Sequence, residues 1–232
     1  MIGRILSAGI VAGLIAGAVG FGTQMLKVIP LIEKAETYET AARARALLRD
    51  KPAGAKVVAL PAKPDPLIRA GLTLIASLLT GVGFGLVLAG AIAFSGRRPG
   101  AAEGLLWGAG GYTAFVLAPA LVLPPHLPGM AEADLVLRQI WWLAVAGTTA
   151  LGLALAAFGA RGKVRLLGIG LLALPFVLAG PAPGQGQGAP LPAELVAGFV
   201  AASLAASAAF WAVLGIGVSM LIRRLEGKAR AP

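Results

Sequence analysis

The stretch ILSAGIVAGLIAGAVGFGTQMLKVIPLI, residues 5–32, decides the fold class of this chain. It is longer than the roughly 20 apolar residues that an α-helix needs to cross a bilayer. Gly9, Gly13 and Gly17 recur every four residues, so they share one helix face on which a second helix can approach closely. The stretch therefore predicts a membrane-spanning helix with a tightly packed neighbour.

The rest of the chain has the same apolar character. Of the 232 residues, 58% are hydrophobic and 13% are charged, whereas charged residues make up about 25% of a soluble domain. We therefore expect an all-α fold, a polytopic α-helical membrane protein in a lipid bilayer, with a single integral membrane domain over residues 1–232. The apolar runs predict about six transmembrane helices, at residues 5–32, 67–95, 101–123, 136–158, 166–180 and 193–222.

Prolines modify two of these runs. Pro119 predicts a kink in the third run. The fifth run is short and contains Pro175, so it leaves open a re-entrant segment and a total of five spans.

One long hydrophilic connection separates the first two runs. Its first part, from Glu33 to Asp50, is rich in Ala, Leu, Arg and Glu and predicts a helix. Pro and Gly predict a loop after it, and Pro66 suits the first turn of the next helix. We expect residues 33–66 to form an extracytoplasmic helical and loop segment.

Basic residues indicate how the chain is oriented. The N-terminus, the tail and the turns after the second and fourth runs all fall on one side of a six-span arrangement. Because short cytoplasmic loops are enriched in Lys and Arg, we expect both termini to be cytoplasmic in a bacterial plasma membrane. The connection 33–69 also carries basic residues on the opposite side, but it contains acidic residues as well. The basic residues of the first side are Arg4, Arg97, Arg98, Arg161, Lys163, Arg165 and those from Arg223 onward.

The composition excludes several function classes. The net charge of +10 fits this orientation and contact with anionic lipid headgroups. Nucleic-acid binding is not predicted, because basic and aromatic residues are not interleaved as such a surface requires. The chain has no cysteine for disulfides, thiolate metal sites or nucleophilic catalysis. It also lacks Walker A, HExxH and GxSxG motifs. We therefore expect no enzyme and no permanently bound cofactor.

Three glutamates follow the first run at intervals of three residues. A helix places Glu33, Glu36 and Glu39 on one face, where their carboxylate oxygens suit a divalent cation. The alternative is a solvated face with ion pairs, since Lys34 is adjacent and Arg43 follows Glu39 by four residues. Spacing alone favours the ion-paired alternative.

The connection LPPHLPGMAEADLVLRQIWW, residues 123–142, concentrates polar groups between two apolar runs. Asp134 and Arg138 are four residues apart and can form an ion pair at the start of the fourth span. Trp141 and Trp142 then fall at the headgroup level. In a six-span arrangement this connection shares the outer side with the three glutamates, so we expect the two to lie side by side. Its candidate metal ligands are His126, Glu132 and Asp134.

Few polar side chains lie within the predicted spans. We expect most of them to form hydrogen bonds within their own helices or with neighbours. Gln24 and Met25 are an exception, because an amide oxygen and a thioether just below the carboxylates could line a path for a partly dehydrated ion. The others include Thr73, Ser77, Thr80, Tyr112, Thr113, Thr148, Thr149, Ser203 and Ser207.

Three stretches of the sequence resemble the CbtA family, the probable cobalt transporter subunits of bacteria. They are VIPLIEKAETYE, LIRAGLTLIASLLTGVGFGLVLAG and APALVLPPHLPGMAEADLVLRQIWW, of which the last is the most specific. The resemblance implies a membrane subunit for the uptake of cobalt(II) that serves cobalamin synthesis. It also implies a partner, the small single-span protein CbtB with a histidine-rich end. The alternatives are a permease or channel for another substrate, such as a different divalent metal, and a membrane scaffold that transports nothing.

The resemblance also draws attention to individual positions. Many relatives are histidine-rich in the first outer connection, but this chain has no histidine there, so histidine-based capture of metal falls to the partner. His126 stands where a carboxylate is expected as often as an imidazole. The family pattern falls on Pro30, Glu33, Glu36, Tyr38, Glu39, Pro119 and Asp134, and on the residues that orient the second outer connection, Pro124, Pro125, Pro128, Gly129, Arg138, Gln139, Trp141 and Trp142.

Overall fold

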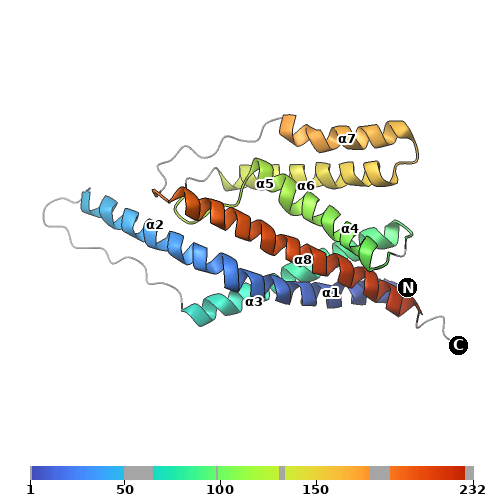
Figure 1. Cartoon of the computed structure of the whole chain (residues 1–232), viewed down its shortest axis with the longest axis horizontal. Helices are drawn as coiled ribbons and strands as arrows, with labels where there is room; N and C mark the ends of the chain where they lie inside the picture. Colours follow the sequence, from blue (N-terminus) through green and yellow to red (C-terminus); the bar gives the residue numbers. More distant parts are fainter. Residues whose placement is uncertain (1, 50–64, 98, 131–133, 178–188, 228–232) are drawn as a thin grey trace.

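The computed structural model describes residues 2–49, 65–97, 99–130, 134–177 and 189–227, and these residues form helices and short connections without a strand (Figure 1). Two of the elements, η1 and η2, are π-helical turns that are continuous with the α-helices on both sides. The all-α prediction is therefore confirmed. The elements are α1 (Ile2–Thr23), η1 (Gln24–Val28), α2 (Ile29–Arg49), α3 (Pro66–Phe94), α4 (Ala101–Tyr112), η2 (Thr113–Leu117), α5 (Ala118–Val122), α6 (Leu135–Phe158), α7 (Gly162–Val177) and α8 (Ala193–Gly227).

Among the described residues, five helical stretches are long enough and apolar enough to cross a membrane. Each coincides with a predicted run, which confirms a polytopic membrane protein. The first stretch is much longer than residues 5–32, because α2 continues the helix through the part of the connection that is rich in Ala, Leu, Arg and Glu. The stretches are Ile2–Leu47, Pro66–Phe94, Ala101–Val122, Leu135–Phe158 and Ala193–Leu225.

The start of α3 is fixed by two adjacent residues. The Asp65 carboxylate accepts a hydrogen bond from the backbone N–H of Leu67 at 2.8 Å, and Pro66 occupies the first turn, as predicted. Residues 50–64, where the sequence predicts a loop, lie outside the described residues.

α7 is a shorter helix that lies beside α6 at the position of the fifth predicted run (Figure 1). It is 16 residues long and runs antiparallel to α6 from the turn at Gly159 (Figure 1). The next described residue, Ala189, donates its backbone N–H to the Gly129 carbonyl oxygen at 2.7 Å. Gly129 precedes α6 and Gly159 follows it. The described part of the fifth predicted run is not among the five stretches of spanning length, so the alternative of five spans stays open, and residues 178–180 of the run lie outside the described residues.

Each π-helical turn ends two residues before a proline, η1 before Pro30 and η2 before Pro119. Proline has no N–H, and its ring crowds the carbonyl four residues earlier. Before Pro119 the N–H of Ala118 bonds to the Thr113 oxygen, one residue further back than in an α-helix. η1 has the same relation to Pro30. The disruption that the sequence predicts at Pro119 is therefore present as a π-helical turn, and Pro30 causes a second one.

Glycines bring α1 and α3 into backbone contact. A methyl group added at Gly9 would lie 2.8 Å from the carbonyl oxygen of Gly85, and one added at Gly17 would lie 2.6 Å from that of Ser77. Gly13 lies between them and faces Gly81. The predicted ridge on the first helix is confirmed, and its neighbour is α3.

Two further helix pairs are joined in the same way. A methyl group at Gly104 of α4 would lie 2.7 Å from the carbonyl oxygen of Gly215 in α8. One at Gly152 of α6 would lie 2.9 Å from that of Gly168 in α7. Such small residues are what lets membrane helices pack closely.

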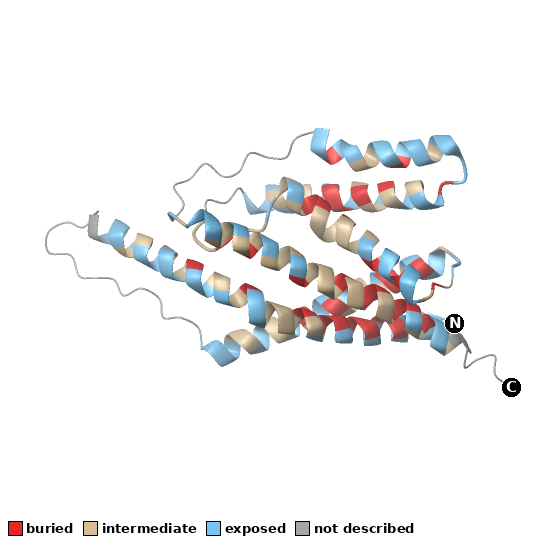
Figure 2. Ribbon diagram, viewed as in Figure 1, coloured by how far each residue is buried: buried red, intermediate tan, exposed pale blue. Residues whose placement is uncertain are grey.

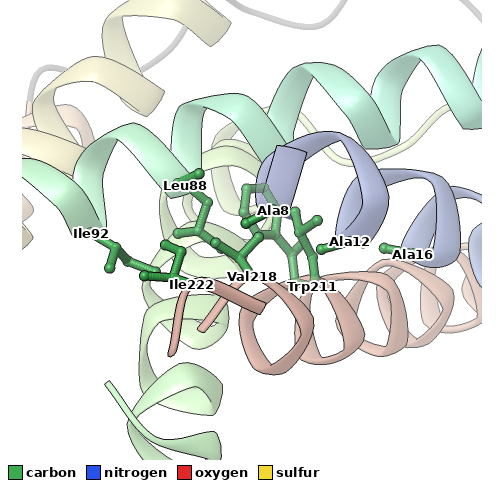
Figure 3. Packing of buried hydrophobic residues seen from close by; sticks show 10 residues of the cluster. Ala8, Ala12, Ala16, Leu88, Ile92, Trp211, Val218 and Ile222 are labelled. Atoms are coloured by element: carbon green, nitrogen blue, oxygen red, sulfur yellow. The ribbon is translucent and has the colours of Figure 1, made fainter. Parts of the chain in front are cut away.

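The core lies where α1, α3 and α8 meet. Figure 2 shows many buried residues in this region and others along α4 and α6, while most of α2 is exposed. Alanines of α1 pack against large side chains of α3 and α8 (Figure 3). The residues of this cluster include Ala8, Ala12, Ala16, Leu88, Ile92, Trp211, Val218 and Ile222.

α1 begins and α8 ends at the same end of the bundle (Figure 1). Ile5 packs into the same cluster as Ile222 and Leu225. The turn after α3 is also at this end, because Arg97 lies over the ring of Phe158, the last residue of α6, at 4.9 Å. The basic turns and both ends of the described chain therefore lie together, as the six-span arrangement predicts.

Candidate functional site

Segments far apart in the sequence meet at the opposite end of the bundle, from which α2 projects and which we call the α2 end (Figure 1). The chain turns at Gly129, whose φ of +85° favours glycine. A methyl group on Gly129 would lie 3.2 Å from Cβ of Glu39 in α2. Leu127 is 1% exposed and packs with Val28 of η1 and Phe199 of α8. The structure thus places the connection 123–130 beside the carboxylate face, as expected.

The glutamates of that face are engaged in ion pairs. The Glu36 carboxylate accepts hydrogen bonds from both terminal nitrogens of Arg69 in α3. Nη1 lies 3.2 Å from Oε2, and Nη2 donates to Oε1. Glu39 pairs with Arg43 at 2.6 Å, as the ion-paired alternative predicts. Glu33 is exposed. The bidentate bond between Glu36 and Arg69 ties α2 to α3 across the α2 end.

Asp134 serves as the N-cap of α6. Its carboxylate accepts the backbone N–H of Leu137 at 3.0 Å. The cap position turns the carboxylate toward the unsatisfied N–H groups of the first turn. The ion pair between Asp134 and Arg138 stays a prediction.

The other residues predicted for this end form no ready-made metal site. His126 is half-buried in the connection 123–130, and Glu132 lies outside the described residues. Within the described ranges, no group of three or more His, Cys, Asp or Glu side chains could hold a metal ion. The orienting residues lie in or next to this connection: Pro124 and Gln139 are exposed, and Pro125, Pro128, Trp141 and Trp142 are half-buried.

A cavity of about 580 Å³ lies inside the bundle, between α1, η1, α3, η2 and α8. Of the described residues that line it, none carries a charge. Of the two residues predicted for an ion path, Gln24 is among the lining residues and Met25 is not; the path itself stays a prediction. The polar lining residues are Gln24, Thr73, Ser77, Thr80, Ser203 and Ser207.

The hydroxyl groups come from one face of each of two helices. Thr73, Ser77 and Thr80 are four and three residues apart and share a face of α3, and Ser203 and Ser207 are four apart on α8. The two faces line the same cavity from different sides, so hydroxyl oxygens converge on the space between the helices.

Gln24 connects this lining to the π-helical turn. Its side-chain nitrogen donates to Oγ of Ser77 at 3.3 Å, which fixes the amide against α3. This bond leaves the amide oxygen as the acceptor that Gln24 brings to the cavity. The second π-helical turn also borders the cavity, through Val116. π-helical turns are frequent at functional sites.

Aromatic side chains close the cavity toward the end that holds the termini. Phe84 lies further along α3 than the hydroxyl face, with its ring 5.1 Å from Phe115 and 5.0 Å from Trp211. Phe115 and Trp211 stack at 5.7 Å, and Phe210 packs edge-on against Trp211 at 5.8 Å. We call these four residues the aromatic floor. They form an apolar cluster of packed rings at this end of the cavity.

The cavity and the α2 end are linked through α3. The Thr73 hydroxyl donates to the backbone oxygen of Arg69 at 2.8 Å, one helical turn nearer to the α2 end. Arg69 in turn holds Glu36. A polar sequence therefore runs from the carboxylates, over the ion pair, to the hydroxyl face and ends at the aromatic floor.

The hydroxyl lining was named by sequence reasoning but not assigned to a site. We expected most hydroxyls in the spans to bond within helices or to neighbours, and those of Thr73, Thr113 and Thr148 do bond to their own helix. In the described part of the chain, Ser203 and Ser207 have no such bond. The sequence signal for Ser203 and Ser207 was their four-residue spacing, which places them on one face of a helix. This face is recognised as part of a cavity only when the structure shows that α3 lies opposite α8.

Comparison with known proteins identifies the chain. Neither the curated proteins nor the solved structures include a significant match to it. The family model described as probable cobalt transporter subunit (CbtA) matches residues 2–223, nearly the whole of the 232-residue chain. This match and the bundle of apolar helices agree with the resemblance seen in the three sequence stretches. The chain therefore belongs to the CbtA family of probable cobalt transporter subunits.

Proposed function

We propose that this chain is the membrane subunit through which cobalt(II) is taken up across a bacterial plasma membrane to supply cobalamin synthesis. The observation that carries the proposal is an uncharged cavity among membrane-spanning helices, whose otherwise apolar lining contains hydroxyl groups and the Gln24 amide. Polar groups gathered at a cavity in such a bundle support a path for a polar solute, because unsatisfied polar groups in a bilayer are costly. The family description names cobalt as that solute.

The α2 end is the entrance in this proposal, and it faces the outside. Glu33, Glu36 and Glu39 attract the cation there, with His126, Glu132 and Asp134 beside them as further candidate ligands. The ion pairs of Glu36 and Glu39 weaken any site that these carboxylates form. A weak site suits an entrance, because conduction requires an ion to bind and then to leave.

Both termini are cytoplasmic in this arrangement. The support is the common position of the ends of the chain and the basic turns, together with the enrichment of Lys and Arg in cytoplasmic loops. The aromatic floor then separates the cavity from the cytoplasm.

A partner completes the transporter. The word subunit in the family description implies a complex, and we propose a small single-span protein of the CbtB kind with a histidine-rich end. This chain carries its one histidine at position 126 and no cysteine. Capture of scarce metal by imidazole groups would therefore be the task of the partner.

The test is uptake of radioactive cobalt by cells that express the chain with and without such a partner. We expect uptake to depend on the chain and to be strongest with the partner. Competition with an excess of unlabelled nickel, zinc, manganese or magnesium distinguishes cobalt from another divalent ion. Loss of uptake in Glu39→Gln, at unchanged protein level, would support the entrance. If cells with the chain took up no more cobalt than cells without it, the chain would be better described as a membrane scaffold that transports nothing.

A further inference from the structure

The cavity offers a cation no ligand that could replace its water. Cobalt(II) exchanges water readily for imidazole and carboxylate groups, but no such group is among the described residues that line the cavity. The polar groups in its otherwise apolar lining are neutral hydroxyls and one amide, which are poor substitutes for water on a divalent ion that holds its hydration shell tightly. The chemistry of the lining therefore suits the shell and not the bare ion.

The hydroxyl groups are arranged to meet water. A hydroxyl in an apolar helix normally bonds to a carbonyl of its own helix, as Thr148 does with Ala144 at 2.7 Å. Within the described ranges, Thr80, Ser203 and Ser207 have no such bond although they line the cavity. Their oxygen lone pairs can accept hydrogen bonds from a molecule or hydrated ion that enters the cavity.

Thr73 and Gln24 each donate a hydrogen-bonding proton to another protein group, so each presents an acceptor oxygen to the cavity. The Thr73 hydroxyl donates to the Arg69 carbonyl oxygen at 2.8 Å, so its own oxygen can only accept from the cavity. The Gln24 amide nitrogen donates to Ser77, which leaves its oxygen as the acceptor. Water bound to a dication is a strong donor, and a set of acceptors is its complement.

The size of the cavity fits a complete shell. Six water molecules occupy about 180 Å³ at the volume they take in the liquid. The cavity of about 580 Å³ therefore holds a hexahydrated ion with space for additional water.

We infer that the cavity binds a divalent cation with its inner water shell intact, through hydrogen bonds from the metal-bound waters to the hydroxyl oxygens of α3 and α8 and the amide oxygen of Gln24. This inference rests on the proposed function and specifies the form in which its substrate is recognised. Because all acceptors are neutral, the ion is held loosely enough to continue its passage.

Hexaamminecobalt(III) tests this inference, because it is an octahedral cation whose six ammonia ligands donate hydrogen bonds as water does but exchange extremely slowly. We expect it to inhibit uptake of radioactive cobalt(II) competitively in right-side-out membrane vesicles from cells that express the chain with its partner. The double variant Ser203→Ala/Ser207→Ala should raise the concentration for half-inhibition about tenfold, since two acceptors of charge-assisted hydrogen bonds are lost. Thr148→Ala is the matched control, because its hydroxyl bonds to its own helix outside the cavity.

Each outcome separates the inference from the function on which it rests. Vesicles that take up cobalt(II) normally but are not inhibited by the ammine complex would overturn the inference and keep the proposed function. Equal inhibition of the parent and the double variant, with both proteins folded by thermal unfolding in detergent, would move the recognition site away from this cavity. Vesicles without any uptake would overturn the proposed function itself.

Discussion

Replacing Gly13 with alanine tests the contact between α1 and α3 most directly. The added methyl group would lie 2.7 Å from both the carbonyl carbon of Gly81 and Cα of Val82, and it would also strike the Gly81 oxygen. Carbon atoms pack best at about 3.5–4.0 Å, so the two helices must separate by roughly 0.8 Å or more. Overpacking of this kind costs about 1–3 kcal/mol. We expect the upper part of that range, because the atoms that are struck belong to the backbone and cannot turn aside.

The matched control is Gly83→Ala in α3, where an added methyl group meets nothing within 4 Å. This change should be neutral or slightly stabilising, since alanine is a better helix former than glycine. Unfolding of both variants in detergent, followed by helical circular dichroism, measures the difference. If Gly13→Ala lost no more stability than Gly83→Ala, the close packing of α1 on α3 would not contribute to the fold as described.

Three further predictions concern the path and its orientation. Glu36→Gln should lower cobalt uptake at limiting cobalt, whereas Arg69→Gln should lower uptake less, because it leaves the carboxylate in place. If the two variants lost equal amounts of uptake and equal amounts of stability, the ion pair would only tie α2 to α3. Phe84→Ala should open the aromatic floor and let cobalt leak from preloaded vesicles, and a folded variant without a leak would place the barrier elsewhere. A cysteine at Ala46 should react with an impermeant thiol reagent in intact cells and one at Ala160 should not, in a chain without any other cysteine; the reverse pattern would invert the proposed orientation.

Hydropathy was sufficient to predict the five stretches of spanning length, because the bilayer sets the length of an apolar helix. It left the short fifth run, residues 166–180, open. The four-residue spacing of Gly9, Gly13 and Gly17 also predicted a close neighbour correctly. What the sequence did not show was the identity of that neighbour, since a ridge on one helix does not say which helix packs against it. The π-helical turn before Pro30 was not predicted either, although proline chemistry explains it once it is seen.

The candidate site was harder to predict because it is assembled from separate helices. Rules of spacing detect partners three or four residues apart, and they found the pair of Glu39 and Arg43. They could not find Arg69 as the partner of Glu36, 33 residues away. Gln24 was identified as a path residue because it is an amide in an apolar run, but its meeting with Ser77 depends on how α3 lies against η1.

The glycine contacts also determine how the bundle can move. Where backbone meets backbone, as between α1 and α3 or between α4 and α8, the two helices have no side chains that could repack, so each pair should behave as one rigid block. The two blocks touch where the alanines of α1 pack against large side chains of α8 (Figure 3). Packed helices can slide by small amounts along such a side-chain boundary. The cavity lies at this boundary. A shear of one block along the other would therefore change the shape of the cavity, and spin labels should report altered distances between α3 and α8 but constant ones between α1 and α3.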